Sequence, residues 1–564
     1  MGDNRYLEAL RRQFRDTPQR VFCRQIAPDG RETLLTWADL EQASAVMTTA
    51  LEASTARPSG EVMIFLRHRP ELYGAFFGAM LGGWAPAFMP CPSAKQDPQL
   101  YWSAHAELFR RIRPAAVITD GETLAGMRAA GLDFCGAALI DVDQSAPAVG
   151  AATAPRSDRA GGDIAFVQHS SGTTGLKKGV ALSFDAVTAQ IDAYAASLRI
   201  GPQDVIVSWL PLYHDMGLIA CLILPAMLGV EIVHLDPFAW VAEPQSLFEQ
   251  IERRGGTLCW MPNFAFEHLA AIVPSQGRRY DLSSIRAFID CSEMCRPDSF
   301  TRFLAAFEAD GVRLEALQCC YAMAETVFAV TQTPLDRPPR RLQAASASLQ
   351  QGMAVREAVE DEPSTMLLEV GEPLSGMIVR IIDADRRPLP AGMVGEIEVS
   401  APYLFDGYQG EPERTAAALK DGAYATSDLG FLLEDRLFVL GRKDDLIVVN
   451  GRNLYAHQME AELSRIGGVK PGRVVAVGVT DERIGSQGLV VIAERAEVSQ
   501  VPDRDVRRAI AETLNTLFAI APRQVRLVEA GWLVKTTSGK ISRKENLARL
   551  LNAPPSGGPP PPVA

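Results

Sequence analysis

The sequence predicts an α/β fold: a large N-terminal domain of βαβ-type sheets flanked by helices, followed by a small α+β domain. Short β-branched runs alternate with helical patterns over most of the chain, which is the pattern of βαβ units. The 564 residues exceed what one hydrophobic core normally holds, and 47% of them are hydrophobic and 22% charged. We therefore expect a folded protein of at least two domains.

Five short apolar runs are typical of buried strands. They are EVMIFL at 61–66, AAVIT at 115–119, DIAFV at 163–167, DVIVSW at 204–209 and VEIVH at 230–234. Ser183 can cap a helix between the third and fourth runs. The apolar face of this helix consists of Val187, Ile191, Tyr194 and Leu198. The apolar stretch 73–89 is too short to cross a bilayer, and we expect a buried helix and strand there and no membrane span.

A second unit is predicted after GRKDDLIVVNGRN at 441–453. It has a helix around 456–466, strands at 474–479 and 488–494, and a helix with Ile510, Leu514 and Leu517 on one face. We place the boundary so that the domains cover 1–443 and 444–552. Residues 553–564 are rich in proline and glycine and predict a disordered tail.

Charge and cysteine content exclude several classes of function. The formal net charge of −12 gives no basic surplus for a nucleic-acid backbone, so we expect no nucleic-acid partner. The polar N-terminus lacks the apolar core of a secretory signal. Nine cysteines are scattered without histidines at zinc-ligand spacing, which favours reduced thiols in a cytoplasmic protein over a metal site.

The stretch SSGTTGLKKGV at 170–180 has the composition of a phosphate-binding loop. Its glycines let backbone N–H groups approach an anion, its hydroxyls add donors, and its lysines supply positive charge. It follows the third strand run and leads to the helix near Ser183, where open α/β sheets bind ligands. A flexible surface connection is the alternative. The Gly-Lys-Ser/Thr ending of P-loop NTPases is missing, and IGSQG at 484–488 lacks the first glycine of a serine hydrolase motif.

Five stretches in this order resemble the motifs of the adenylate-forming superfamily, which includes acyl-CoA synthetases, luciferases and peptide-synthetase adenylation domains. They are SSGTTGLKKGV at 170–180, YAMAE at 321–325, TSDLG at 426–430, GRKDD at 441–445 and KTTSGKISR at 535–543. Each stretch alone is weak, but the whole set in the family's order is specific. The resemblance implies that a carboxylate attacks the α-phosphorus of ATP and expels pyrophosphate, and that a thiol or amine then opens the mixed anhydride.

The resemblance implies a phosphate and metal site. The residues that would contact the β- and γ-phosphates are Ser171, Thr173, Thr174 and Lys178. Lys177 stands where the family usually has proline. Glu325 would hold Mg²⁺, and Lys540 would reach the bridging oxygen and the acyl carboxylate. Asp444 occupies the position of the interdomain hinge, about which the small domain would move.

The same resemblance implies an adenosine site. Tyr321 would stack on adenine, close to Glu293, and Asp428 and Arg442 would bind the ribose. Taken one at a time, Tyr321 could be an ordinary core tyrosine, Asp428 a turn residue and Arg442 a surface ion pair. Their joint register with the other motifs favours the nucleotide-binding roles.

Finer features resemble one branch of the superfamily, the fatty-acyl-AMP ligases, which typically pass the acyl group to a carrier protein. These features are WLPLYHDMGLI at 209–219, PNFAF at 262–266, DLSSIRAFIDCSEMCRPDSF at 281–300 and VNGRNLYAHQME at 449–460. The polar, turn-rich segment at about 331–365 resembles the insertion that distinguishes this branch and is thought to restrict domain movement. A tolerated surface insertion is the alternative.

The acyl pocket should be apolar with a few orienting polar groups. The candidates for its lining, each of which could equally be plain core, are Trp209, Tyr213, Met216, Met261, Phe264 and Phe266. Their size favours a lipid-like or bulky hydrophobic acid. His214 is interpreted as a polar group near the acyl carboxylate and is not expected to face its neighbour Asp215.

The sequence therefore predicts an ATP- and Mg²⁺-dependent ligase that converts a hydrophobic carboxylic acid to acyl-AMP. The predicted acceptor is the phosphopantetheine thiol of an acyl carrier protein. An acyl-CoA synthetase that uses coenzyme A shares every ATP-site residue and stays open as an alternative. A nucleotide-dependent binding protein without catalysis is the alternative of another class.

Overall fold

The computed structural model describes residues 4–92, 98–144, 159–170, 178–449, 452–481, 486–497, 499–518, 520–535 and 541–552. The described chain up to Leu440 forms one compact unit, and the chain from Gly441 forms a second. The second unit begins at Gly441, three residues before the predicted boundary at Asp444. Strand β23 (Arg436–Arg442) pairs with β22 (Ala423–Leu433), so the chain leaves the N-terminal unit only near the end of β23.

The largest sheet of the N-terminal unit has nine described strands. In spatial order they are β17 (Glu372–Pro373), β14 (Ala329–Gln332), β13 (Leu317–Ala322), β12 (Ala287–Asp290), β11 (Leu258–Met261), β9 (Val205–Ser208), β10 (Glu231–Leu235), β1 (Val21–Ile26) and β2 (Glu32–Thr36). The six strands from β13 to β1 are parallel, and antiparallel strands lie at both edges. Strands β9 and β10 are two of the predicted runs, and their side chains are mostly buried, as expected for a sheet covered on both faces.

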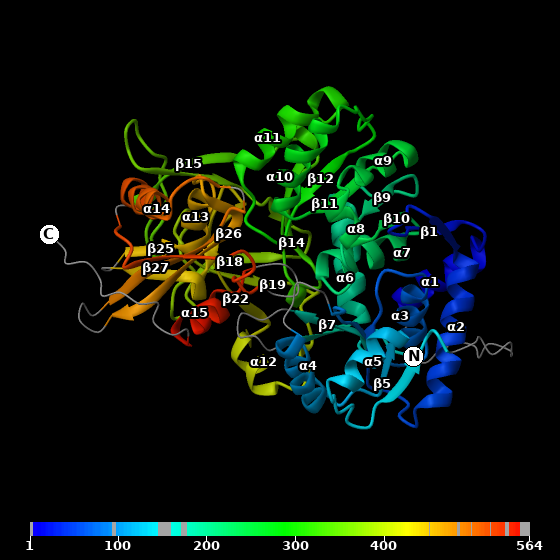
Figure 1. Cartoon of the computed structure of the whole chain (residues 1–564). Coiled ribbons are helices and arrows are strands. Elements are labelled where there is room, and N and C mark those ends of the chain that lie inside the picture. Colours follow the sequence, from blue (N-terminus) through cyan, green and yellow to red (C-terminus); the bar gives the residue numbers. More distant parts are fainter. Residues whose placement is uncertain are drawn as a thin grey trace. The chain divides into compact units, whose positions relative to one another are not determined.

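Helices connect the parallel strands and cover the sheet, in the green part of Figure 1. They are η1 (Met216–Ile223), α7 (Leu224–Leu228), α8 (Pro237–Ala242), α9 (Gln245–Arg254), α10 (Asn263–Ile272), η2 (Val273–Gln276), α11 (Pro297–Phe307), η3 (Glu308–Asp310) and η4 (Leu314–Ala316). Helix η1 is a π-helix in which every residue is buried. Within the described ranges, no helix is both long and apolar enough to cross a bilayer.

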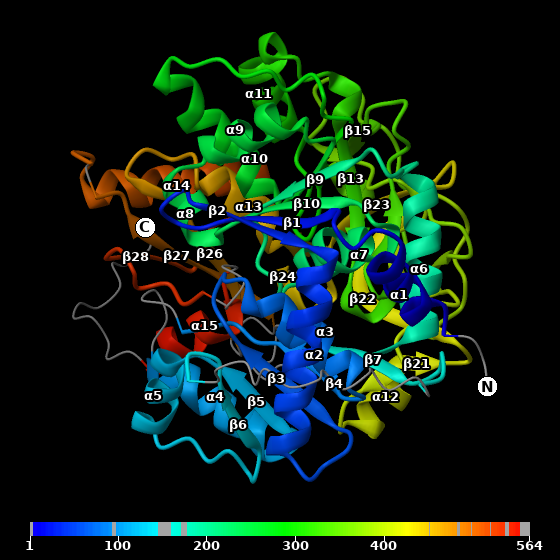
Figure 2. The same ribbon diagram turned by 90° about the vertical axis from the view of Figure 1, so that its right-hand side faces the viewer.

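A second sheet of the N-terminal unit is entirely parallel, with the order β4 (Ala85–Phe88), β3 (Glu61–Phe65), β5 (Ala116–Thr119) and β6 (Ala138–Asp141). The helices of this part of the chain are α1 (Arg5–Asp16), α2 (Trp37–Ser54), α3 (Glu71–Leu81), α4 (Pro98–Ile112) and α5 (Gly121–Ala129). The predicted buried helix and strand at 73–89 are α3 and β4. Figure 2 shows α2 and α3 side by side; a Cβ at Gly78 would lie 2.6 Å from the Ser44 carbonyl oxygen, so the packing requires glycine.

The helix predicted near Ser183 is present, but a strand that was not predicted from the sequence precedes it. Strand β7 (Ile164–Ser170) pairs antiparallel with β8 (Lys178–Ser183), which pairs with β20 (Gly407–Tyr408). Only then does α6 (Phe184–Ser197) begin, with the Ser183 hydroxyl accepting a hydrogen bond from the Ala186 N–H as predicted. The strand forms because Val180 and Leu182 are buried in the core and β20, more than 200 residues later, supplies its other edge.

The remaining part of the N-terminal unit is antiparallel. Its five-stranded sheet contains β18 (Ile378–Ile382), β19 (Gly395–Ser400), β21 (Leu419–Lys420), β22 and β23, with α12 (Pro412–Ala418) beside it. The segment predicted as an insertion contains β15 (Arg341–Ala345) and the short helix η6 (Ser346–Ser348). Strand β15 pairs with β16 (Ser364–Leu368), which begins at the end of the segment and extends beyond it.

A buried ion pair holds the base of this two-stranded sheet. Glu369 follows β16, has no exposed surface, and accepts a hydrogen bond of 2.5 Å from Arg337. Arg337 also pairs with Glu372 at 2.7 Å, and Arg436 of β23 lies 3.4 Å from Glu369. Two arginines therefore compensate one carboxylate that water does not reach.

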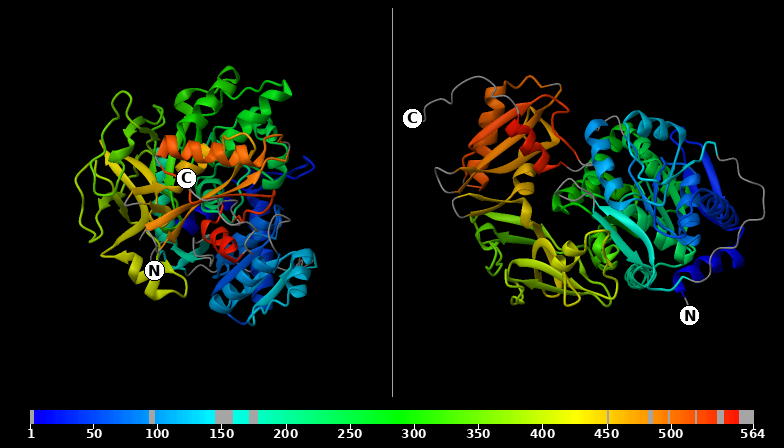
Figure 3. Two further views of the ribbon diagram at one scale, coloured as in Figure 1. Left: turned by 60° about the vertical axis from the view of Figure 1, so that its left-hand side comes forward. Right: turned by 90° about the horizontal axis from the view of Figure 1, so that it is seen from below.

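The C-terminal unit, orange to red in Figure 3, has its own core. Its strands are β24 (Leu446–Val449), β25 (Arg452–Tyr455), β26 (Val469–Asp481), β27 (Ser486–Arg495) and β28 (Gln524–Val528). Its helices are η7 (Lys443–Asp445), α13 (Ala456–Leu463), α14 (Asp503–Phe518) and α15 (Arg543–Asn552). Ile510 and Leu514 of α14 are buried as predicted, but Leu517 is 51% exposed, because Val506 takes the remaining place on the buried face.

An ionic clasp joins three distant parts of the C-terminal unit. Arg543, the first residue of α15, pairs with Asp445 of η7 at 2.7 Å and with Glu460 of α13 at 2.6 Å. Glu460 also accepts a hydrogen bond from the Ala476 N–H of β26. The pKa of Arg543 is raised by both carboxylates despite its burial. Arg543 therefore stays ionised, and the clasp fixes the start of α15 to the start of the unit.

Candidate active site

The carboxyl ends of the parallel strands bring several predicted residues together. Trp209 follows β9, Phe264 follows β11, and Ser292 and Glu293 follow β12. The Phe264 N–H donates to the Glu293 carboxylate at 3.2 Å, and the Trp209 and Phe264 rings lie 5.9 Å apart. The Ser292 hydroxyl lies 3.9 Å from the Met216 sulfur. This edge is where open α/β sheets bind ligands.

Trp240 of α8 extends this aromatic group and was missed from the sequence. Its ring stacks on Trp209, with centroids 3.7 Å apart and planes 6° apart. The sequence did contain a signal for it. Strand β10 lies beside β9, so a tryptophan soon after β10 can be expected near Trp209, which follows β9. Phe264 is 44% exposed. Met261 and Phe266 have no exposed surface, and Phe266 packs on Phe300 and Phe303, so these two lie in the core.

His214 and Asp215 do face each other, contrary to the expectation for adjacent residues. The His214 Nδ1 lies 2.5 Å from the Asp215 Oδ1. The geometry arises because Asp215 caps the start of η1, where its side chain turns back to accept a hydrogen bond from the Met216 N–H. Tyr213, on the other side of His214, is only partly exposed, and burial raises its pKa to about 12, so its hydroxyl stays protonated at neutral pH.

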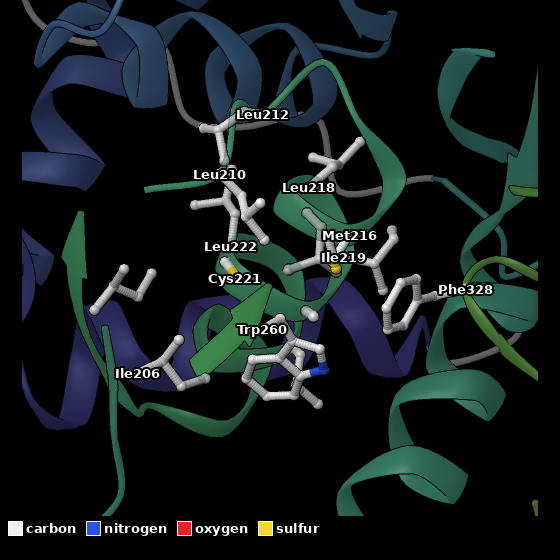
Figure 4. Packing of buried hydrophobic residues seen from close by; sticks show 14 of the residues in the cluster. Ile206, Leu210, Leu212, Met216, Leu218, Ile219, Cys221, Leu222, Trp260 and Phe328 are labelled. Carbon is white, nitrogen blue, oxygen red and sulfur yellow. The ribbon is translucent and has the colours of Figure 1, made fainter. Parts of the chain in front are cut away.

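A buried chain of hydrogen bonds supports the segment after β9, which includes Tyr213, His214 and Asp215. The His234 Nε2–H donates to the Leu210 carbonyl at 3.0 Å, and the Tyr73 hydroxyl donates to the His234 Nδ1 at 2.8 Å. The Cys23 thiol in turn donates to the Tyr73 oxygen at 3.3 Å. Leu210 belongs to the core drawn in Figure 4, together with Met216. The chain therefore ties the segment after β9 to β10, α3 and β1.

The burial of His234 predicts a pH-dependent stability. Burial, with the neighbouring His68 adding to it, lowers the pKa of His234 to about 3, whereas an unfolded histidine titrates near 6.5. Below pH ~6.5 the unfolded state binds the extra proton, so the free energy of unfolding falls by up to ~1.4 kcal/mol per pH unit as the pH drops toward 3. Urea unfolding at several pH values, followed by tryptophan fluorescence, should show a shallower decrease for His234→Gln. Equal slopes for the two proteins would contradict the prediction.

Two predicted adenosine residues meet in the N-terminal unit. The Tyr321 hydroxyl, at the end of β13, donates a hydrogen bond of 2.5 Å to the Asp428 carboxylate of β22. Tyr321 is partly exposed and Asp428 is 8% exposed, so both side chains reach the boundary between core and surface. Tyr321 and Asp428 are 107 residues apart in the chain, and their hydrogen bond joins the nine-stranded sheet to the five-stranded sheet.

Glu325 lies in η5 (Ala324–Thr326), directly after β13, and is 8% exposed. The Tyr408 hydroxyl donates to its carboxylate at 2.7 Å, and the Tyr424 hydroxyl lies 3.3 Å from that of Tyr408. The Lys178 ammonium lies 5.1 Å from the centre of the Tyr408 ring. Tyr408 thus contacts the predicted metal ligand and a predicted phosphate ligand. The sequence held no local signal for it, because its partners are 83 and 230 residues away.

The other predicted nucleotide residues are placed as follows. Arg442, the last residue of β23, and Asp444 of η7 are exposed, and Lys178 is the first residue of β8. Glu293 is exposed. Four of the predicted residues lie outside the described parts of the chain: Ser171, Thr173, Thr174 and Lys540. Lys177 lies outside them as well.

A model of the AMP-binding enzyme family matches residues 10–409. The chain belongs to the AMP-binding enzyme family. This AMP-binding enzyme is 28% identical to the long-chain-fatty-acid–AMP ligase FadD32 of Mycolicibacterium smegmatis, over 93% of the chain and 90% of that protein. It is 29% identical to a putative acyl-CoA synthetase of Caulobacter vibrioides, over 91% of the chain and 89% of that protein.

A solved structure agrees with these relatives. The AMP-binding enzyme is similar to a fatty acyl-adenylate ligase from L. pneumophila in complex with acyl adenylate and pyrophosphate. The TM-score is 0.75 at 25% identity, over 98% of this chain and 97% of that one. The α/β fold, the superfamily and the adenylate-forming ligase class predicted from the sequence are confirmed.

Proposed function

We propose that this AMP-binding enzyme converts a fatty or other hydrophobic carboxylic acid to its acyl-adenylate and delivers the acyl group to the phosphopantetheine thiol of a carrier protein. The observation that carries the proposal is the Tyr321–Asp428 hydrogen bond beside Glu325. It brings together, within one unit, the residues expected at adenine, ribose and metal. The aromatic group formed by Trp209, Trp240 and Phe264, in which Phe264 is exposed and the two tryptophans are buried, supports a hydrophobic acid.

The residues present fit a magnesium ion. Mg²⁺ prefers oxygen ligands and is usually bound by one or two carboxylates together with substrate phosphates. Glu325 provides such a carboxylate, and accepting one hydrogen bond from Tyr408 leaves it further lone pairs. The ion would neutralise charge on the phosphates during displacement of pyrophosphate. Glu325 would bind it, while Tyr321 and Asp428 would orient the adenosine.

The acceptor of the acyl group is part of the proposal. The names of the two relatives described above imply different acceptors, since one is named an AMP ligase and the other a putative acyl-CoA synthetase. The segment 331–365 favours the carrier protein, because the two-stranded sheet that β15 of this segment forms with β16 is anchored by Glu369 and two arginines, which is consistent with a restricting insertion. The nine free cysteines support the cytoplasm as the proposed location.

Product analysis tests the proposed function. The pure protein would be incubated with ATP, Mg²⁺ and carboxylic acids of increasing chain length, with coenzyme A, with a phosphopantetheinylated carrier protein, or with neither. Mass spectrometry should show acyl-AMP with hydrophobic acids and an acyl thioester on the carrier. If acyl-CoA formed as fast as acyl-AMP, the acceptor would be coenzyme A and not a carrier protein. Absence of any adenylate would favour a binding protein without catalysis.

A further inference from the structure

Tyr408 occupies a position that links two groups of opposite charge. Strand β20 places it opposite Val180 of β8, two residues after Lys178, and the Gln409 N–H donates to the Gly179 carbonyl at 2.7 Å. On its other side, the Phe405 N–H donates to the Glu325 carbonyl at 2.9 Å. The backbone around Tyr408 is therefore bonded both to the strand that follows the glycine-rich stretch and to the turn that carries Glu325.

The side chain of Tyr408 makes a separate contact with each group. Its hydroxyl donates to the Glu325 carboxylate at 2.7 Å, and its ring centre lies 5.1 Å from the Lys178 ammonium, within the range of a cation–π interaction. Tyr408 is 5% exposed, so both contacts are made largely away from water, where they are stronger than at the surface.

The hydroxyl of Tyr408 is itself held in place. The Tyr424 hydroxyl lies 3.3 Å from it, and Phe405 packs against both rings at 4.9 and 5.4 Å. The one proton of the Tyr408 hydroxyl is donated to Glu325, so the Tyr424 hydroxyl is the donor in its contact with Tyr408. The direction of the chain is then Tyr424 to Tyr408 to Glu325, which fixes the orientation of the Glu325 carboxylate.

We propose that Tyr408 is a positioning residue that orients the Glu325 carboxylate toward a divalent cation through its hydroxyl and holds the Lys178 ammonium toward phosphate through its ring. The inference rests on the proposed function, because it takes Glu325 as the metal ligand and Lys178 as a phosphate contact. Partners that orient a metal-binding carboxylate typically change metal affinity or activity by ~10–100-fold when they are removed. One side chain would thus couple the metal and phosphate parts of the site.

Tyr408→Phe tests the hydroxyl and keeps the ring. Mn²⁺ would be titrated by electron paramagnetic resonance in the presence of a non-hydrolysable ATP analogue, so that the readout does not depend on turnover. The dissociation constant for Mn²⁺ should rise by ~10-fold or more. Tyr424→Phe, which removes the hydroxyl one step away, should cause a smaller rise in the same direction.

Tyr403→Phe is the matched control. Tyr403 is 1% exposed and lies in the same part of the chain, but its hydroxyl donates to the Ser375 carbonyl and not to Glu325. The control variant should bind Mn²⁺ as the parent protein does. An unchanged Mn²⁺ affinity in Tyr408→Phe, or an equal loss in Tyr403→Phe, would overturn the role of the hydroxyl.

Tyr408→Leu tests the ring. In addition to the effect of the Phe variant, it should raise the KM for ATP at saturating Mg²⁺ by ~3–10-fold, because Lys178 loses the ring face. A folded Leu variant with an unchanged KM for ATP would overturn the role of the ring. If that variant does not fold, the Phe variant still decides the hydroxyl by itself. Should the chain form no adenylate at all, the Mn²⁺ titration still separates the failure of this inference from the failure of the proposed function.

Discussion

Replacing Lys540 with alanine is expected to slow acyl-adenylate formation by ~10²–10³-fold while the affinity for ATP changes little. The expected loss is that of one donor aimed at charge that develops in the transition state. The lysine lies outside the described residues, but Lys535 and Ile541 on either side of 536–540 pair with each other, and the Ser542 N–H donates to the Val534 carbonyl at 3.1 Å. The chain on both sides of this stretch is therefore fixed.

The Lys540 experiment separates binding from chemistry. Pyrophosphate release with a saturating acid would report adenylation, and calorimetric titration with ATP would report nucleotide binding. Lys544→Ala is the matched control, because it removes an exposed lysine four residues later. It should retain the parent rate. Unchanged adenylation in Lys540→Ala would show that the register carried over from the superfamily is wrong.

Replacing Arg337 with alanine is expected to lower the free energy of unfolding by ~3 kcal/mol, because it leaves the Glu369 carboxylate buried with less compensation. Arg436, at 3.4 Å, retains part of the attraction but does not replace the closer hydrogen bond. Urea unfolding at neutral pH would measure the change. The same variant should loosen the base of the two-stranded sheet β15–β16, which limited proteolysis of the segment 331–365 would reveal.

Arg340→Ala is the control for this experiment. Arg340 has a similar exposure to Arg337, but its carboxylate partners, Glu434 and Glu357, are 66% and 74% exposed. Ion pairs of that kind contribute ~1 kcal/mol or less. If the two arginine variants lost equal stability, burial of Glu369 would not be the cause of the effect.

Much of the fold could be predicted because it depends on local patterns. The five apolar runs are strands, and Ser183 caps α6, since a run of buried β-branched residues and a capping hydroxyl need no distant partner. Strand β8 could not be predicted, because its apolar part is short and its pairing with β20 joins residues more than 200 positions apart. The exposure of Leu517 depends on how α14 is rotated against the core, which spacing alone does not determine.

The candidate site was predictable to the extent that it resembles known motifs. Tyr321, Glu325 and Asp428 were named from such motifs, and Tyr321 and Asp428 prove to be in contact. Tyr408 and Trp240 were missed because their importance lies in contacts with residues far away in the chain. The His214–Asp215 contact was missed because it depends on the cap of a π-helix.

The clasp formed by Arg543, Asp445 and Glu460 has a consequence for protein engineering. Asp445 lies at the beginning of the C-terminal unit and Arg543 near its end, so any chimaera that takes this unit from another ligase must keep the two together. A junction at residue 441 transfers all three residues as one set. A junction at residue 446 leaves a foreign residue opposite Arg543, and we expect chimaeras joined there to lose activity even when both halves fold.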